Sequence, residues 1–286
     1  MSKQPMVISS HPTARRLPPS AGPADLELAG GPALLAGVEQ TGVPALRWYG
    51  MSPPALIVGS SQRLDEIDHA ACASAGLRIH RRRSGGGAVL SADMLMLDLV
   101  LPRAHPLYMD DVTESYRWIG EVWAMALRDL GVDASVTSVG AARADSQALD
   151  PLVRRVCFGG LSPYEVVVGQ RKLVGLAQVR RRRGVLYQVG IYLRWAPQRT
   201  AALLAAMPGE RVALEQQLAA RVAGLGELLD APSAEVIAAF ESALARLAGL
   251  ALSDDAWNDS EIAARAAESG RYMPIDSRSQ ESEARS

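Results

Sequence analysis

The chain has 286 residues, enough for one large or two small domains with a sizeable buried core. Apolar residues make up 48 % of it and charged residues 21 %, the balance of an ordinary soluble globular protein. The formal net charge of −1 argues against a protein that binds nucleic acid through its overall charge, and no segment has the roughly eighteen uninterrupted apolar residues of a membrane span.

The two cysteines, Cys72 and Cys157, are too few for a disulfide framework and indicate a reducing, cytoplasmic compartment. The four histidines show no metal-ligand spacing with each other or with the cysteines, so we expect no metal site. The N-terminal residues contain no hydrophobic run of the kind found in secretory signals.

Both ends of the chain are polar and rich in serine. We expect residues 1–25 and 269–286 to be disordered tails. No repeat or long linker separates them, so residues 26–268 are predicted to form a single domain, with its core at about 40–230.

The first predicted elements are two short strands at residues 45–49 and 55–59, separated by a Ser-Pro-Pro turn signal. A helix is predicted at 65–75, and Gly76 follows it at the usual place for a left-handed cap.

Three more strands are predicted at residues 77–83, 88–91 and 94–101. The last is nearly all apolar, which indicates a central strand. A helix with apolar residues at three- and four-residue steps begins after residue 111, and Gly131 ends it.

Residues 137–155 are expected to be irregular, while 164–168, 171–178 and 185–193 form a plausible antiparallel meander. Residues 199–268 are rich in alanine and leucine and are predicted to be helical. This order indicates an α+β (or α/β-like) fold, in which a mixed, largely antiparallel sheet is packed with helices and followed by a helical C-terminal segment.

The most unusual segment is residues 81–90, with the sequence RRRSGGGAVL. Three adjacent glycines can adopt positive φ and approach a ligand closely, and successive N–H groups in such a loop can bind an anion. The neighbouring arginines suit a phosphate. However, neither G-x-x-x-x-G-K-[ST] nor G-x-G-x-x-G is present, and a tight inter-strand loop with a solvated basic flank explains the composition equally well.

Cys157 lies just before a predicted strand, and Lys172 follows it fifteen positions later. A thiol becomes a good nucleophile near neutral pH when a nearby ammonium stabilises its thiolate. For a single cysteine the residues alone favour an inert buried thiol, and a lone lysine on a strand is usually solvated. Cys72, among alanines on a helix, is interpreted as such a buried residue.

Taken together, these segments resemble the lipoate-protein ligase and octanoyltransferase family, to which biotin-protein ligases are distantly related. The resemblance rests on RRRSGGGAVL at 81–90 and on GQRKLVGLAQVR at 169–180, with weaker support from 187–193. It implies a mixed-sheet catalytic domain in which the glycine-rich segment and the lysine strand line one pocket.

The resemblance also implies the roles of individual residues. Lys172 matches the lysine that contacts the reacting carbonyl, and Cys157 is similar to the upstream cysteine of one octanoyltransferase type. The residues expected to bind the acyl group or its adenylate are Arg82, Ser84, Gly85, Gly86, Gly87, Ala88, Val89, Leu90, Gly175, Ala177, Gln178 and Gly190.

Two mechanisms occur in such a family. Octanoyltransferases take octanoate from acyl carrier protein through a cysteine thioester and use no cofactor, whereas ligases make a lipoyl-adenylate with ATP and Mg. Both attach the acyl group to a lysine of a lipoyl carrier domain. The cysteine before the lysine favours the transferase, and the ligase is kept as the alternative.

The sequence departs from the family pattern at three places. Ser91-Ala92 stand where His-Asp is common, Leu176 replaces a serine or asparagine, and Val189 replaces a histidine. These changes leave room for a third hypothesis, a non-catalytic module that binds an acyl group or a lipoyl domain.

A basic run, Arg180 to Arg183, lies at the predicted hairpin turn. It is interpreted either as a solvated tip that resists edge aggregation or as a patch that steers an acidic carrier protein.

Overall fold

A mixed nine-stranded sheet forms the centre of the protein in the computed structural model, which describes residues 13–275. In spatial order its main path runs through β12 (Ala251–Asp254), β1 (Thr13–Arg16), β3 (Ala45–Met51), β7 (Met94–Pro102), β11 (Gly184–Tyr192), β10 (Arg171–Arg181), β9 (Val166–Val168) and β8 (Ala134–Val136), and β2 (Ser20–Gly22) pairs with β3. Along this path every pairing from β3 through β7, β11, β10 and β9 to β8 is antiparallel, whereas β1 pairs in parallel with β12 and β3, and β2 pairs in parallel with β3. The predicted mixed, largely antiparallel sheet is confirmed.

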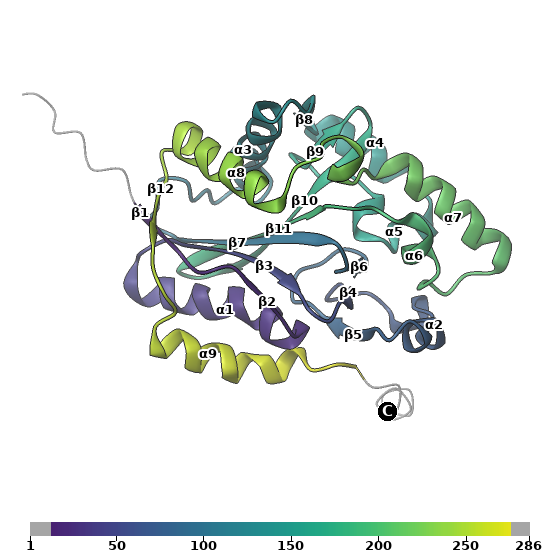
Figure 1. The fold of residues 1–286 in the computed structure, drawn as a ribbon, viewed down its shortest axis with the longest axis horizontal. Coiled ribbons are helices and arrows are strands. Elements are labelled where there is room, and N and C mark those ends of the chain that lie inside the picture. The colour runs from purple at the N-terminus through teal and green to yellow at the C-terminus, as the bar shows by residue number, and fades with distance from the viewer. Residues whose placement is uncertain (1–12, 276–286) are drawn as a thin grey trace, which may run out of the picture.

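Strand β7 is central, as its apolar sequence predicted. All of its nine residues are buried, because helices cover both faces of the sheet. Helix α1 (Ala24–Thr41) packs on one face, with α9 (Asp259–Ser269) outside it, and α3 (Arg117–Asp129) and α8 (Ser233–Ala248) cover the other (Figure 1). The largest apolar core lies between the sheet and the α3–α8 pair.

A smaller three-stranded sheet lies beside the main one, in the order β5 (Arg78–Arg81), β4 (Ala55–Val58) and β6 (Val89–Leu90). The helices at this end of the molecule are α2 (His69–Ser74), α4 (Val139–Ala148), α5 (Pro151–Arg154), α6 (Pro197–Ala201) and α7 (Pro208–Arg221). A second apolar core joins this sheet to α2, α5, α6 and α7. Cys72 lies in it, fully buried, and burial raises the pKa of its thiol to about 11.

The predicted strands and the antiparallel meander β9–β10–β11 are present, and Gly76 and Gly131 have the positive φ expected of residues that end helices. The predicted helix at 65–75 is shorter: a 3₁₀ turn (Leu64–Glu66) comes first, and Asp68 caps α2 by accepting from the Ala71 N–H.

The prediction of irregular structure at 137–155 is wrong, since α4 and α5 occupy most of this segment. Ser138 accepts from the Ala141 N–H at the start of α4, and Asp150 accepts from the Leu152 N–H at the start of α5, where Pro151 is the first residue. The caps were visible in the sequence, but both helices are too short for a clear apolar period.

The predicted tails are also wrong over their inner parts. Residues 13–25 form β1, β2 and the start of α1, and β1 is inserted between β3 and β12. After α9, Tyr272 is buried and the Ile275 N–H donates to the Ile79 carbonyl. These polar segments gain order from partners far away in the sequence. Residues 1–12 and 276–286 lie outside the described part of the chain.

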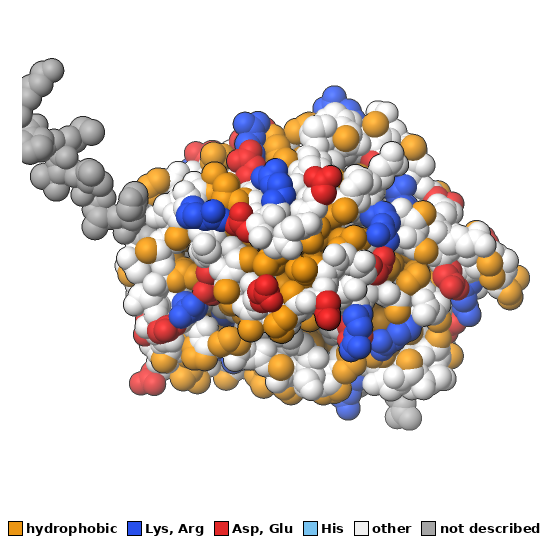
Figure 2. Space-filling view, turned by 45° about the horizontal axis from the view of Figure 1, so that its top comes forward, with side chains coloured by type: hydrophobic (Ala, Val, Ile, Leu, Met, Phe, Trp, Pro, Cys, Tyr) orange, Lys and Arg blue, Asp and Glu red, His pale blue; other side chains and the backbone are white. Residues whose placement is uncertain are grey.

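The distribution of charge on the surface and the length of the helices are two further properties of the structure. Lys and Arg side chains are interspersed with Asp and Glu side chains over the face shown in Figure 2, rather than gathered into one basic field. Among residues 13–275, none of the helices is long and apolar enough to span a bilayer.

Candidate functional site

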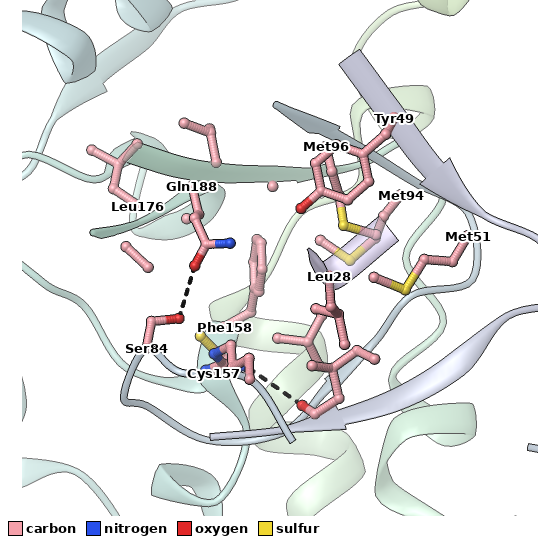
Figure 3. Close-up of a pocket in the computed structure, with 17 residues that line it drawn as sticks. Leu28, Tyr49, Met51, Ser84, Met94, Met96, Cys157, Phe158, Leu176 and Gln188 are labelled. Carbon is pink, nitrogen blue, oxygen red and sulfur yellow. Dashed lines mark hydrogen bonds between the residues drawn. The ribbon is translucent and has the colours of Figure 1, made fainter. Parts of the chain in front are cut away.

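A mostly apolar pocket lies where the two sheets meet, and the half-buried Cys157 thiol opens into it. Its lining comes from α1, β3, β4, β6, β7, β10, β11 and the loops around them: Leu28, Tyr49, Met51, Ile57, Arg82, Ser84, Val89, Met94, Met96, Cys157, Phe158, Gly175, Leu176, Ala177, Gln188, Val189 and Gly190. Cys157 lies near Ser84 and Gln188, with Leu28 and Met51 on the opposite side (Figure 3). An unbranched acyl chain suits such a lining, because methionine side chains adapt to a flexible apolar ligand.

The glycine-rich loop packs directly against the segment that carries the thiol. The Ala88 N–H donates to the Arg155 carbonyl at 2.7 Å, and the Cys157 N–H donates to the Ala88 carbonyl at 3.0 Å. A Cβ on Gly87 would stand 2.4 Å from the Arg155 carbonyl oxygen, and one on Gly59 would stand 1.8 Å from that of Gly86. Only glycine permits these approaches, which explains part of the glycine run without any ligand.

Arg82 braces the same loop from inside. Its Nη2 donates to the carbonyls of Gly85 and Gly87 at 2.7 and 2.9 Å. A Cβ on Gly86 would stand 3.0 Å from Arg82 Nη2 and 3.4 Å from Cys157 Sγ, so the guanidinium and the thiol lie beside the same glycine. The positive charge next to the thiol at this point is therefore that of Arg82.

Lys172 lies beneath the pocket and does not line it. Its side chain is buried, and Nζ contacts Glu165 Oε1 at 2.6 Å and donates to the carbonyls of Cys157 and Gly160 at 3.1 and 3.2 Å. The ammonium thus binds the backbone of the short 3₁₀ turn η3 (Cys157–Gly159). Burial raises the pKa of the Glu165 carboxyl, and the Lys172 charge opposes that rise.

Two glycines form the floor of the pocket under an aromatic ring. Gly175 on β10 pairs with Gly190 on β11, and a Cβ on Gly175 would stand 3.1 Å from the Phe158 ring. The Phe158 ring in turn packs edge-on against Tyr192, whose hydroxyl donates to the Leu90 carbonyl. Larger residues at the two glycines would fill the space between the sheet and the Phe158 ring.

Seven of the predicted site residues line the pocket: Arg82, Ser84, Val89, Cys157, Gly175, Ala177 and Gly190. Gly85, Gly86, Gly87 and Ala88 form the loop next to the thiol, and Leu90 is a buried residue of β6 that does not line the pocket. Gln178 lies apart from the pocket, since its side-chain amide donates to the Val112 carbonyl and to Ser115.

The pocket residues on α1, β3 and β7, of which Leu28, Met51 and Met96 are examples, were not predicted from the sequence, because they belong to ordinary apolar elements. Glu165 was not predicted either, although a signal was present. A carboxylate within the apolar run Tyr164–Val168 has to find a partner when that run is buried.

The basic run lies away from the pocket. The hairpin turns at Arg182 and Arg183, and six residues separate Gly175 from Arg181 along β10, about 20 Å of strand. Arg180 is held by the carbonyls of Met109 and Asp110. The run therefore does not border the thiol, and its role in steering a carrier protein stays a prediction.

The amino-acid sequence is similar to that of known proteins over most of its length. Residues 28–245 match a family described as the lipoyl protein ligase A/B catalytic domain. The octanoyltransferase LipM of Kyrpidia tusciae is 38 % identical over 209 residues, covering 71 % of this chain and 73 % of that protein.

Two solved structures share the fold. The bipartite lipoate protein ligase of Thermoplasma acidophilum has a TM-score of 0.75 at 20 % identity, covering 91 % of this chain and 93 % of that one. A lipoate-protein ligase A bound with ATP has a TM-score of 0.72 at 21 % identity, covering 91 % and 95 %. Identities this low show the fold alone.

Proposed function

The chain belongs to the lipoyl protein ligase A/B catalytic domain family, and from this premise we propose that it is an octanoyltransferase that modifies a lysine of a lipoyl carrier domain. The observation that carries the proposal is the Cys157 thiol, which opens into an apolar pocket between the glycine-rich loop and the Phe158 turn. The relative with 38 % identity bears the name of an octanoyltransferase, and the Thermoplasma ligase is described together with an E2 lipoyl domain.

The proposed first step is thioester exchange at Cys157. The thiolate attacks the carbonyl carbon of an octanoyl thioester, the bond from that carbon to the donor sulfur breaks, and the donor leaves as a thiol after taking up a proton. Acyl carrier protein is the proposed donor. Arg82 beside the thiol and the Lys172 ammonium behind the turn supply positive charge where negative charge develops on the carbonyl oxygen.

The second step passes the acyl group to the acceptor. The neutral amine of a lysine on the lipoyl domain attacks the Cys157 thioester, an amide forms, and the cysteine thiol is regenerated. Neither step needs a cofactor. The pocket holds the octanoyl chain throughout, with its apolar end toward Leu28 and Met51.

Intact-protein mass spectrometry tests this proposal. The protein is mixed with octanoyl-acyl carrier protein without ATP, beside Cys157→Ser and a matched Cys72→Ser control. We expect an octanoyl adduct on the wild type and on the Cys72 variant, whose thiol is buried in the second core, and none on the Cys157 variant.

Two results would contradict the thioester route. An adduct on Cys157→Ser that maps to a residue other than Ser at position 157 would place the acyl group elsewhere, and transfer that requires Mg-ATP and survives loss of the thiol would show a lipoate-protein ligase instead.

A further inference from the structure

A buried carboxylate, that of Glu165, lies behind the thiol and has no part in the reaction described so far. Glu165 stands just before β9, in a segment where the neighbouring Tyr164, Val166 and Val167 are all buried. Only 2 % of Glu165 and 1 % of Lys172 is exposed, so this ion pair is shielded from water. A buried carboxylate persists only where fixed partners replace its hydration.

The partners of Glu165 are fixed by the fold. Oε1 contacts Lys172 Nζ at 2.6 Å and accepts from the Leu176 N–H at 3.2 Å, and Oε2 accepts from the Ser162 N–H at 2.7 Å. Two backbone donors from different segments therefore hold the carboxylate, and its position in turn determines where the ammonium lies.

The three N–H donors of Lys172 are all engaged. One faces Glu165, and the other two reach the carbonyls of Cys157 and Gly160, on either side of the η3 turn. Nζ also lies 5.0 Å from the centre of the Phe158 ring. Without the carboxylate, two carbonyls and a ring would have to hold a buried ammonium that has lost its only counter-charge among the described contacts.

We propose that Glu165 is a positioning residue for acyl transfer, which acts by holding the charged Lys172 side chain against the turn that carries Cys157. This inference rests on the proposed function, because it assigns a role in the same site.

Other charged groups also face this site. Arg82 lies beside the thiol, Tyr192 packs against Phe158, and Arg221 donates to the Gly159 carbonyl while pairing with Asp145. Burial raises the pKa of the Tyr192 hydroxyl, which keeps it neutral. None of these four groups contacts Lys172 Nζ among the described interactions, so replacing Glu165 changes the charge balance of Lys172 specifically.

The test compares Glu165→Gln with Glu227→Gln. Glu227 pairs at 2.6 Å with Arg171, the residue before Lys172 on β10, and accepts from the Gly224 N–H, but it lies at the surface and away from the pocket. Two rates are measured against pH: acylation of Cys157 by octanoyl-acyl carrier protein, and alkylation of Cys157 by iodoacetamide.

For Glu165→Gln we expect acylation to slow about tenfold or more, because the Lys172 ammonium is no longer held against the η3 turn, and we expect the dependence of both rates on pH to differ from that of the wild type. Glu227→Gln should match the wild type in both. Unchanged profiles in Glu165→Gln, measured well below its melting temperature, would overturn the proposal.

A double variant separates positioning from a merely structural role. Glu165→Gln with Lys172→Met leaves no unpaired buried charge, so it can fold even where the single Glu165 variant does not. If Glu165 acts through Lys172, the double variant has the same alkylation and acylation rates as Lys172→Met alone. A further loss in the double variant would show an independent role and overturn the proposal.

The two readouts also distinguish this inference from the proposed function. Alkylation needs no acyl donor, so a wild type that is not acylated would refute the transferase while the alkylation profiles still decide the role of Glu165.

Discussion

Two buried ion clusters flank the pocket, and each places its cation over an aromatic ring that lines it. In the arginine cluster, Arg47 pairs with Glu27 and Asp98, and its guanidinium lies 4.0 Å from the centre of the Tyr49 ring. In the lysine cluster, Lys172 pairs with Glu165 beneath Phe158. All five charged side chains are almost fully buried.

The clusters differ in what they hold together. The arginine cluster joins α1 to β3 and β7, and Gly30 and Gly31 let the helix approach, since a Cβ on Gly30 would stand 2.4 Å from the guanidinium carbon. The lysine cluster instead binds the backbone on either side of the turn that carries Cys157. A guanidinium keeps its proton under all ordinary conditions, whereas a buried ammonium depends on its partners to do so. Of the two clusters, the arginine cluster joins a helix to the sheet, whereas the lysine cluster lies behind the Cys157 turn.

The largest expected effect is on the arginine cluster. Arg47→Met leaves Asp98 and Glu27 without their main partner, and we expect the free energy of unfolding to fall by about 3–5 kcal/mol. Urea denaturation measures this loss. The surface pair Arg103–Asp110 provides the control, because Arg103→Met should cost less than about 1 kcal/mol. Equal losses in the two variants would remove the distinction between the clusters and ordinary ion pairs.

The next effect separates the two clusters. Lys172→Met should slow acylation of Cys157 by about 10²–10³-fold, the range seen when one stabilising donor is removed. Its unfolding free energy should fall less than that of Arg47→Met, because Lys172→Met leaves one buried carboxylate without its cation, whereas Arg47→Met affects two. Single-turnover acylation and urea denaturation of both variants test this. An acylation rate close to wild type in Lys172→Met would show that the lysine cluster, like the arginine cluster, only stabilises the fold.

Glycine replacements probe the two clusters more gently. In Gly31→Ala the Cβ would stand 2.7 Å from Asp98 Oδ2, and we expect a net loss of about 1–3 kcal/mol despite the better helix propensity. In Gly175→Ala the Cβ meets Phe158 at 3.1 Å and Lys172 Cε at 3.3 Å, so stability should fall by less than about 1.5 kcal/mol while acylation slows. Thermal unfolding and acylation rates of both variants test this prediction. A larger loss of stability in Gly175→Ala than in Gly31→Ala, together with slower acylation in Gly31→Ala, would contradict the comparison.

The smallest expected effect is the contribution of two buried histidines to the pH dependence of stability. It has to be subtracted before that dependence is used to compare the two clusters. Burial lowers the pKa of His80 and His105 below 6.5 in the folded protein. Their contribution to stability is therefore complete above pH 6.5 and is lost as the pH falls below it, because the unfolded chain binds protons first. His105→Asn, which can still accept from the Leu107 N–H, should flatten the dependence of the unfolding free energy between pH 7.5 and pH 5.5. A dependence as steep as that of the wild type would assign it to other groups.

Part of the site was predictable because its signal is local. The glycine-rich segment, Cys157 and the lysine strand were identified from short motifs, and the structure brings the thiol and the loop into contact. The predicted partnership of Lys172 with the thiol took a different form, since the ammonium binds the Cys157 carbonyl and Glu165. Spacing along the chain places a lysine near a cysteine but does not say which atom its ammonium will meet.

The sequence by itself determined the family, the mixed sheet and the central strand β7, because motifs and apolar runs are properties of neighbouring residues. Only the tertiary structure decided which apolar side chains line the pocket and how residues 13–25 and 270–275 become ordered. It also paired each buried charge. An arginine at 47, an aspartate at 98 and a glutamate at 165 each signal that a partner is required. The partner itself is chosen by packing between segments that are up to 51 residues apart in these pairs, through contacts that no local pattern records.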